Sequence, residues 1–348
     1  MAADRITWRY WEGGLPQDGG DWPEREAFNA VSARSLSEQL TTVRFAGPLA
    51  LGDLPLICVV RNERARLPLF FRHYRELGVT RFLMIDNGSS DGTRELLLAQ
   101  DGVDVLDARA SFRDSYCGAY WTNALAHAHC RGRWVLRADA DELLVYDGME
   151  SHPLPDLARL LDATGFDRLY APMLDLYSSA AFAGGERGIE QIFAGDSWFD
   201  SEGYELARWK EGWYLTGGPR ARLFNREGKQ NYSHWLSKYP FFHMDAAKAL
   251  FNPHYMWPFD QVTKGPMAAL LHLKLFDDFP ERSATFAREK RHAHHSLAYR
   301  LYNEVMREQA SMSAMHAQSR RYRGPKSLLR HRMMLPLDWS KLPKADLG

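Results

Sequence analysis

Three carboxylates occur within four residues of the segment WVLRADADE: Asp139, Asp141 and Glu142. Two ionised carboxylates about 5 Å apart repel by roughly 3 kcal/mol at an effective dielectric constant near 20. Placement at a helix N-terminus would stabilise each ionised acid by only about 0.3–1 kcal/mol. A divalent cation removes the conflict, and oxygen ligands at this density suit Mg²⁺ or Mn²⁺ shared with substrate phosphates. The cluster therefore predicts a metal site that binds a diphosphate, with a solvated helix cap as the alternative.

The segments around this cluster predict an α/β fold. Short apolar runs at 54–60, 81–86 and 103–107, and the one before the acids, read as strands, and helical spacing follows at 66–79, 93–100 and about 117–129. Alternating strands and helices indicate a mostly parallel, Rossmann-like sheet flanked by helices. Ligands in such sheets bind beyond the carboxyl ends of the strands. Three of these ends carry polar residues: Arg61-Asn62-Glu63, Asp86-Asn87-Gly88-Ser89 and the acidic cluster.

The pattern of residue types divides the chain into three regions. We expect residues 1–50 to be an N-terminal extension, because they lack clear periodicity. We expect residues 51–280 to form the main domain, with a nucleotide-binding half at 51–150 and an acceptor-side half at 151–280 that contains short strand candidates such as RLYAPMLDLY, ARLFN and ALLHLKLF. Residues 281–348 are expected to be a basic, helical C-terminal tail.

Composition excludes several classes of protein. The 348 residues carry 44 basic and 44 acidic side chains, so there is no overall field to attract a nucleic acid. The three cysteines form no CxxC pair, the start lacks a signal-peptide pattern, and the longest apolar run is too short to cross a bilayer. We expect a cytoplasmic protein. We expect the basic tail to be a solvated surface helix, and peripheral contact of this tail with anionic lipid is the alternative.

Three segments occur in an order and spacing typical of one enzyme family: VVRNERARLPLFFRHYRELGV, MIDNGSSDGT and WVLRADADELL. The chain resembles glycosyltransferases of the family 2 type with the GT-A fold, whose signals are a polar loop after the first strand, a D-[DN]-G-S-x-D-G-T turn and a D-x-D motif. The later segments GGPRARLF, SKYP and ALLHLKLFDDF are similar to a bacterial branch related to family 92 type transferases. The shared segments span about residues 54 to 290.

The resemblance implies a nucleotide-sugar donor, often a UDP-sugar, with its base in the first loop and its diphosphate on the metal. Matched residue by residue, Asp86 would hydrogen-bond the base and Asp141 would bind the metal. The other positions implied at the nucleotide are Asn62 and Glu63 in the base loop, Asn87 beside Asp86, and Asp139 at the ribose or the metal.

Two further segments offer polar pairs. In ALLHLKLF the two-residue period of a strand places His272 and Lys274 on one face, where His272 could bind the cation and Lys274 could neutralise the diphosphate. In GGPRARLF the same period would place Arg220 and Arg222 together to clamp phosphate oxygens. Solvated strand faces are the alternative for both pairs.

The catalytic base is harder to place, because the E-D pair that many family 2 enzymes carry is missing from the expected region. An inverting transfer needs a carboxylate within hydrogen-bond reach of the acceptor hydroxyl. Asp200 and Glu205 lie in the aromatic segment DSWFDSEGYELARW, and Asp175 is a rival. Candidate platforms for a sugar ring, with a core position as the alternative, are Trp198, Trp209, Trp213 and Trp235.

Together these observations predict a metal-dependent, inverting glycosyltransferase that moves a sugar from a nucleotide donor, a UDP-sugar being favoured, to a hydroxyl of a glycan or glycolipid. A sugar nucleotidyltransferase is an alternative, although the glycine-rich phosphate loop of that class is missing after the first strand. A non-catalytic glycan-binding protein that has kept the fold is another.

Overall fold

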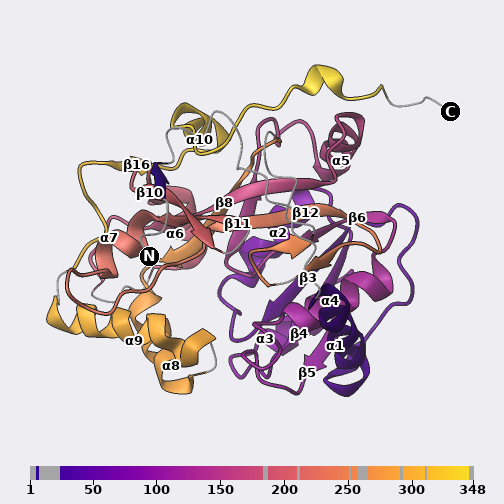
Figure 1. Ribbon diagram of the computed structural model, residues 1–348, viewed down its shortest axis with the longest axis horizontal. Helices are drawn as coiled ribbons and strands as arrows, with labels where there is room; N and C mark the ends of the chain where they lie inside the picture. The colour runs from indigo at the N-terminus through magenta and orange to yellow at the C-terminus, as the bar shows by residue number, and fades with distance from the viewer. Residues whose placement is uncertain are drawn as a thin grey trace.

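The computed structural model describes residues 5–7, 24–182, 187–209, 212–250, 252–257, 265–290, 293–309 and 312–344. Its centre is an eleven-stranded sheet (Figure 1). Four neighbouring strands are parallel, in the order β5-β4-β3-β6. Their bounds are β3 Pro55–Val60, β4 Arg81–Asp86, β5 Val103–Ala108 and β6 Arg133–Arg137. The α/β class with a parallel, Rossmann-like sheet is thereby confirmed.

Helices connect these parallel strands where the sequence predicts them. The connecting helices are α2 Leu67–Glu76, α3 Thr93–Leu98 and α4 Ala119–His129. Apolar residues in β3 and β4 are buried, because both faces of the parallel sheet are covered. The chain order reverses between β3 and β6, which is the position where open α/β sheets bind ligands.

Antiparallel strands extend the sheet on both sides. β12 (Ser237–Met244) lies between β6 and β8 (Arg168–Tyr177) and is antiparallel to both. β15 (Ala269–Leu275) runs parallel to β8 and antiparallel to β7 (Glu142–Val145). The remaining strands of this sheet are β2 Leu40–Arg44, β9 Trp198–Asp200 and β16 Ser319–Arg321.

Residues 24–44 contribute to this architecture. α1 (Glu24–Glu38) packs against α4, and β2 pairs with β5 at the edge of the sheet. Smaller elements complete the two halves: the sheet of β1 Arg5–Thr7, β10 Tyr204–Trp209 and β11 Gly212–Gly217, the pair β13 Ala249–Leu250 and β14 Met256–Trp257, and the helices α5 Leu154–Ala163 and α6 Ile189–Gly195.

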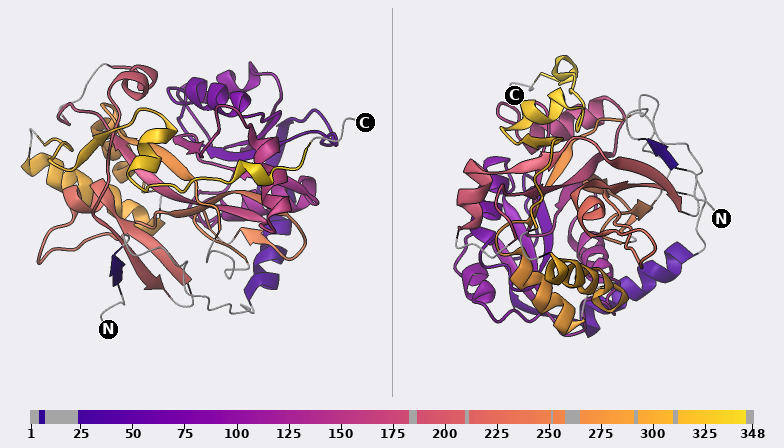
Figure 2. Two further views of the ribbon diagram at one scale, coloured as in Figure 1. Left: turned by 90° about the horizontal axis from the view of Figure 1, so that it is seen from above. Right: turned by 90° about the vertical axis from the view of Figure 1, so that its left-hand side faces the viewer.

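The C-terminal region is helical in its first part and largely extended afterwards. α8 (Phe279–Glu289) and α9 (Ala293–Glu308) pack together, and in the described residues they are followed by β16, α10 (Pro325–Arg330) and a short 3₁₀ turn, Trp339–Lys341. Figure 2 shows this last segment, in yellow, crossing the molecule. Trp339 stacks on His152 with 4.0 Å between ring centroids, which fixes the segment to the loop before α5. In the described part of the chain, no helix is long and apolar enough to cross a membrane.

The prediction of a strand in GGPRARLF is wrong, because residues Gly218–Phe224 form helix α7. Pro219 lies in the first turn, where its fixed φ and missing N–H suit a helix. Side chains two positions apart in a helix diverge, so Arg220 and Arg222 reach different partners. Arg220 donates to Asp175, and Arg222 donates to Asp200.

Gly217, at the start of α7, has a conformation that other residues cannot take easily. Its φ is +104°, and a Cβ atom there would overlap the carbonyl oxygen of Gly203. Gly217→Ala is therefore expected to lower the free energy of unfolding by roughly 2–3 kcal/mol, measured by urea denaturation. Gly228→Ala is the control, because Gly228 also has a positive φ but nothing lies within 4 Å of its added Cβ. Equal losses in the two variants would show that the contact with Gly203 does not matter.

Candidate active site

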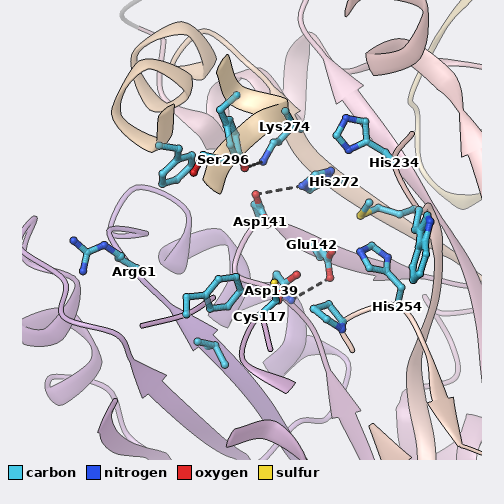
Figure 3. A pocket seen from close by; sticks show the side chains of 18 of the residues that line it. Arg61, Cys117, Asp139, Asp141, Glu142, His234, His254, His272, Lys274 and Ser296 are labelled. Carbon is cyan, nitrogen blue, oxygen red and sulfur yellow. Dashed lines mark hydrogen bonds and ion pairs between the residues drawn. The ribbon is translucent and has the colours of Figure 1, made fainter. Parts of the chain in front are cut away.

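A cavity of about 670 Å³ opens beyond the carboxyl ends of β3 and β6 (Figure 3). One wall comes from the polar loops of the parallel half and the opposite wall from β15 and the α8–α9 pair. The structure thus brings the acidic cluster of residues 139–142 to the place that the sequence predicts. The other lining side chains used below are Glu63, Asn87, Arg220, His234, Trp235, Lys238, His254, His272, Lys274, Arg282 and Tyr302.

Two carboxylates of the cluster are bound to basic side chains. Asp139 accepts hydrogen bonds from Arg137 Nη2 at 3.0 Å and from Lys238 Nζ at 3.1 Å. The same Lys238 lies 2.7 Å from Glu142 Oε1. Burial alone would raise the pKa of Asp139, but Arg137 and Lys238 outweigh it and lower that pKa. Glu142 is almost fully buried, and burial followed by the charge of Asp139 raises its pKa.

Asp141 lies instead at the start of a buried chain of charged groups. Its Oδ2 is 3.3 Å from His272 Nε2, and His272 Nδ1 is 2.6 Å from Asp175 Oδ1. Asp175 is fully buried and accepts a 2.7 Å hydrogen bond from Arg220 Nε. Burial would raise the pKa of Asp141, yet the neighbouring His272 holds it well below its usual range. Asp175 therefore fixes the orientation of the imidazole that faces Asp141.

The strand register explains why these groups meet. His272 of β15 is paired with Glu142 of β7 on one side and with Asp175 of β8 on the other. The backbone N–H of Leu273 donates to Asp141 O at 2.8 Å, which ties the acidic loop to the same strand. As predicted from the two-residue period, His272 and Lys274 both face the cavity, while the alternating Leu271, Leu273 and Leu275 are buried.

The described residues contain no group of three or more His, Cys, Asp or Glu side chains gathered to hold a metal ion. The predicted ligand set of Asp139, Asp141 and His272 is thus not assembled, because Asp139 is held by Arg137 and Lys238. Asp141 and His272 by themselves do fit one ion. Two adjacent ligands at about 2.1 Å from an octahedral cation lie about 3.0 Å apart, close to the 3.3 Å found here. A carboxylate on the second ring nitrogen, as supplied by Asp175, is usual for a metal-binding histidine.

The residues predicted to bind the nucleotide take different positions. Asp86 does not line the cavity, because its Oδ1 accepts hydrogen bonds from the N–H and hydroxyl of Ser89 and so holds the turn. Asn62 likewise binds Ser90 N through its Oδ1, at 2.8 Å. Asn87 does face the cavity, and its Nδ2 donates to the carbonyls of Ala108 and Ala110.

Asn87 and Glu63, both predicted to bind the nucleotide, line the cavity. The amide orientation of Asn87 leaves its buried Oδ1 without a hydrogen bond among the described residues. Glu63 also lines the cavity, and Arg282 Nη2 lies 2.6 Å from its carboxylate. Burial raises the pKa of Glu63 even beside Arg282.

None of the three predicted catalytic carboxylates lines the cavity. Asp200 is buried elsewhere and accepts hydrogen bonds from Tyr177 and Arg222. Glu205 lies on β10, paired with Thr216 of β11. Asp175 lies behind His272. Their position follows from packing between distant segments, which the local sequence does not encode.

Several cavity residues were not singled out from the sequence as functional. Lys238 comes from SKYP and His254 from NPH, and neither segment has a periodic pattern that marks a site. The only signal for Lys238 was that SKYP is one of the segments that carry the family resemblance. Trp235 does line the cavity, whereas Trp198 donates to Asp196. The side chains of Trp209 and Trp213 lie outside the described residues.

No protein-family model and no curated protein matches the chain. Solved structures that it resembles include the mannosyltransferase PcManGT from Pyrobaculum calidifontis in complex with GDP-Man and Mn²⁺, at 15% identity and TM-score 0.23 over 42% of each chain. A 4-diphosphocytidyl-2C-methyl-D-erythritol synthase matches at 14% identity and TM-score 0.23, over 56% of this chain and 75% of its own. The inositol-1-phosphate CTP transferase from T. maritima matches at 10% identity and TM-score 0.25, over 85% and 99%. The fold assignment rests on the strand order above.

Proposed function

We propose that the protein is a metal-dependent, inverting glycosyltransferase of the GT-A type, which transfers a sugar from a nucleotide donor, a UDP-sugar being favoured, to a hydroxyl of a glycan or glycolipid. The observation that carries this proposal is the pair Asp141–His272, supported by buried Asp175, in a cavity at the strand-order reversal. These two side chains would hold Mn²⁺ or Mg²⁺. When bound, such an ion offsets the charge that develops on a leaving diphosphate.

The other cavity residues suit the parts of a nucleotide sugar. Lys274 and Arg282 are both close enough to Asp141 to lower its pKa, so they can face the same phosphates. Asn87 and Glu63 lie at the nucleotide end, where the free Oδ1 of Asn87 can accept a hydrogen bond from a base. Trp235 offers a ring face of the kind on which sugars pack.

A thermal-shift screen of UDP- and GDP-sugars with and without Mn²⁺ tests the proposal. A donor at 100 times its Kd stabilises a protein by about 2.7 kcal/mol, which corresponds to a rise in melting temperature of several degrees. We expect one nucleotide class to give this rise only with Mn²⁺, followed by slow release of the nucleoside diphosphate. No rise with any donor contradicts the proposal. Release of pyrophosphate from a nucleoside triphosphate and a sugar 1-phosphate would instead identify a nucleotidyltransferase.

A further inference from the structure

Four histidines line the cavity, and they differ in what their ring nitrogens contact. His294 is exposed. His272 has Asp175 on one nitrogen and Asp141 on the other. His234 is also fully engaged, because its Nδ1 accepts from Arg220 Nη1 at 3.0 Å and its Nε2 contacts the hydroxyl of Tyr302. Neither of these two enclosed rings has a nitrogen available for a substrate.

His254 is different, because one ring nitrogen is fixed and the other is available. Its Nδ1 lies 3.2 Å from the carbonyl oxygen of Ser237. A carbonyl only accepts hydrogen bonds, so Nδ1 carries the proton and the lone pair of the neutral ring is on Nε2. Among the described residues, Nε2 has no hydrogen-bond partner. Asn252 Oδ1 also accepts hydrogen bonds from the backbone N–H groups of His254 and Tyr255, which hold the turn of the loop.

The charges around His254 keep the ring neutral. Burial lowers its pKa well below the usual value, and the nearby cations Lys238 and Arg137 lower it further, while Asp139 opposes them. A ring that is neutral at physiological pH can accept a proton. A modest basicity suffices, because an attacking hydroxyl becomes strongly acidic as its oxygen bonds to the sugar carbon.

The position of His254 relates it to the reaction of the proposed function. Lys238, whose charge lowers the pKa of His254, also contacts both Asp139 and Glu142. His254 therefore lies beside the acidic cluster (Figure 3). Trp235 lies next to it, with 6.3 Å between the ring centroids and an angle of 81° between the planes. A sugar packed on the indole face would therefore bring its hydroxyls near this imidazole.

We propose that His254 is the general base, and that Trp235 and His254 form the subsite for a sugar hydroxyl of the acceptor; this inference rests on the proposed function. The acceptor oxygen forms a bond to the anomeric carbon as the bond from that carbon to the diphosphate oxygen breaks. The nucleoside diphosphate leaves with the electron pair. The hydroxyl proton moves to Nε2 of His254, and the resulting imidazolium then releases it to water.

His254→Asn separates this role from a structural one, because the Asn amide can still donate to Ser237 O but offers no basic nitrogen. The assay follows hydrolysis of the nucleotide sugar selected by the screen, with water in place of the acceptor hydroxyl. We expect an unchanged Mn²⁺-dependent thermal shift and a rate about 100-fold lower. In His254→Ala, added imidazole should raise the rate of hydrolysis roughly tenfold. His243→Asn is the control, since His243 lies at the far end of β12 and outside the cavity.

The outcomes distinguish this inference from the proposed function. If the unaltered protein binds and hydrolyses a nucleotide sugar but His254→Asn does so at a similar rate, the base is another group. The same conclusion follows if His254→Asn loses the thermal shift, because His254 would then be a binding residue. If the unaltered protein neither binds nor hydrolyses any nucleotide sugar, the proposed function itself fails and takes the inference with it.

Discussion

Asp141→Asn is expected to weaken Mn²⁺-dependent nucleotide binding by roughly 1000-fold. This loss exceeds the loss of about 10–100-fold in metal affinity that usually follows mutation of a residue hydrogen-bonded to a metal ligand. The substitution keeps the shape of the side chain but removes the charge that faces His272. An amide is a poorer ligand for a hard cation than a carboxylate. Calorimetric titration of UDP or GDP with and without Mn²⁺ measures the effect.

Two comparisons make this prediction sharper. Asp175→Asn removes the buried partner of His272 without touching the cation, so a loss of only about 10–100-fold is expected. Asp101→Asn, at an exposed turn, should change nothing. Unchanged titration heat in Asp141→Asn would remove the proposed metal site. A larger loss of Mn²⁺-dependent nucleotide affinity in Asp139→Asn than in Asp141→Asn would show that Asp139 is the metal ligand.

Arg220→Leu is expected to cost about 3–5 kcal/mol of unfolding free energy, the largest stability effect predicted here. The salt bridge of Arg220 and Asp175 is almost entirely buried, with 6% and 0% of the two side chains exposed. Leucine would leave the carboxylate of Asp175 buried, with the hydrogen bond to His272 but without its guanidinium partner. Removing one member of a buried pair is costly because the other charge remains without compensation. Urea denaturation followed by tryptophan fluorescence measures the loss.

An exposed ion pair provides the matched control. Arg72 and Glu190 are 3.1 Å apart, with 50% and 44% of their side chains exposed, so Arg72→Leu should cost less than about 1 kcal/mol. The double variant Asp175→Asn, Arg220→Leu should recover part of the loss, since no unpaired buried charge remains. Similar costs for Arg220→Leu and Arg72→Leu would mean that the buried pair contributes no more than a surface pair.

The parallel half was predictable because its information is local. The segment at 54–60 is apolar and β-branched, the following helix has a clear periodicity, and the turn NGSSDG contains residues that favour a tight turn. The acidic cluster follows the same rule, since it is placed by the end of a strand. The edge strand β2 was missed because a five-residue strand with three polar or charged side chains, LTTVR, carries little pattern.

The region after residue 150 was less predictable because its contacts join distant segments. His254 approaches the acidic cluster only through the loop after β13, and nothing in NPH indicates that its Nδ1 will bind Ser237. The short pattern in GGPRARLF fits a strand and a helix equally well, and Pro219 decides for the helix. Asp200 and Glu205 looked suitable as a base by composition, but the fold directs Asp200 to Arg222 and His316 instead.

The insertion of β12 between β6 and β8 has a consequence for expression and folding of the chain. Strand 237–244 completes hydrogen bonds of a strand that ends about one hundred residues earlier, at Arg137. A fragment that stops near residue 150 would therefore expose a bare strand edge and tend to aggregate. During synthesis the nascent parallel half must wait for this late strand, so premature termination or slow translation after α5 should increase dependence on chaperones.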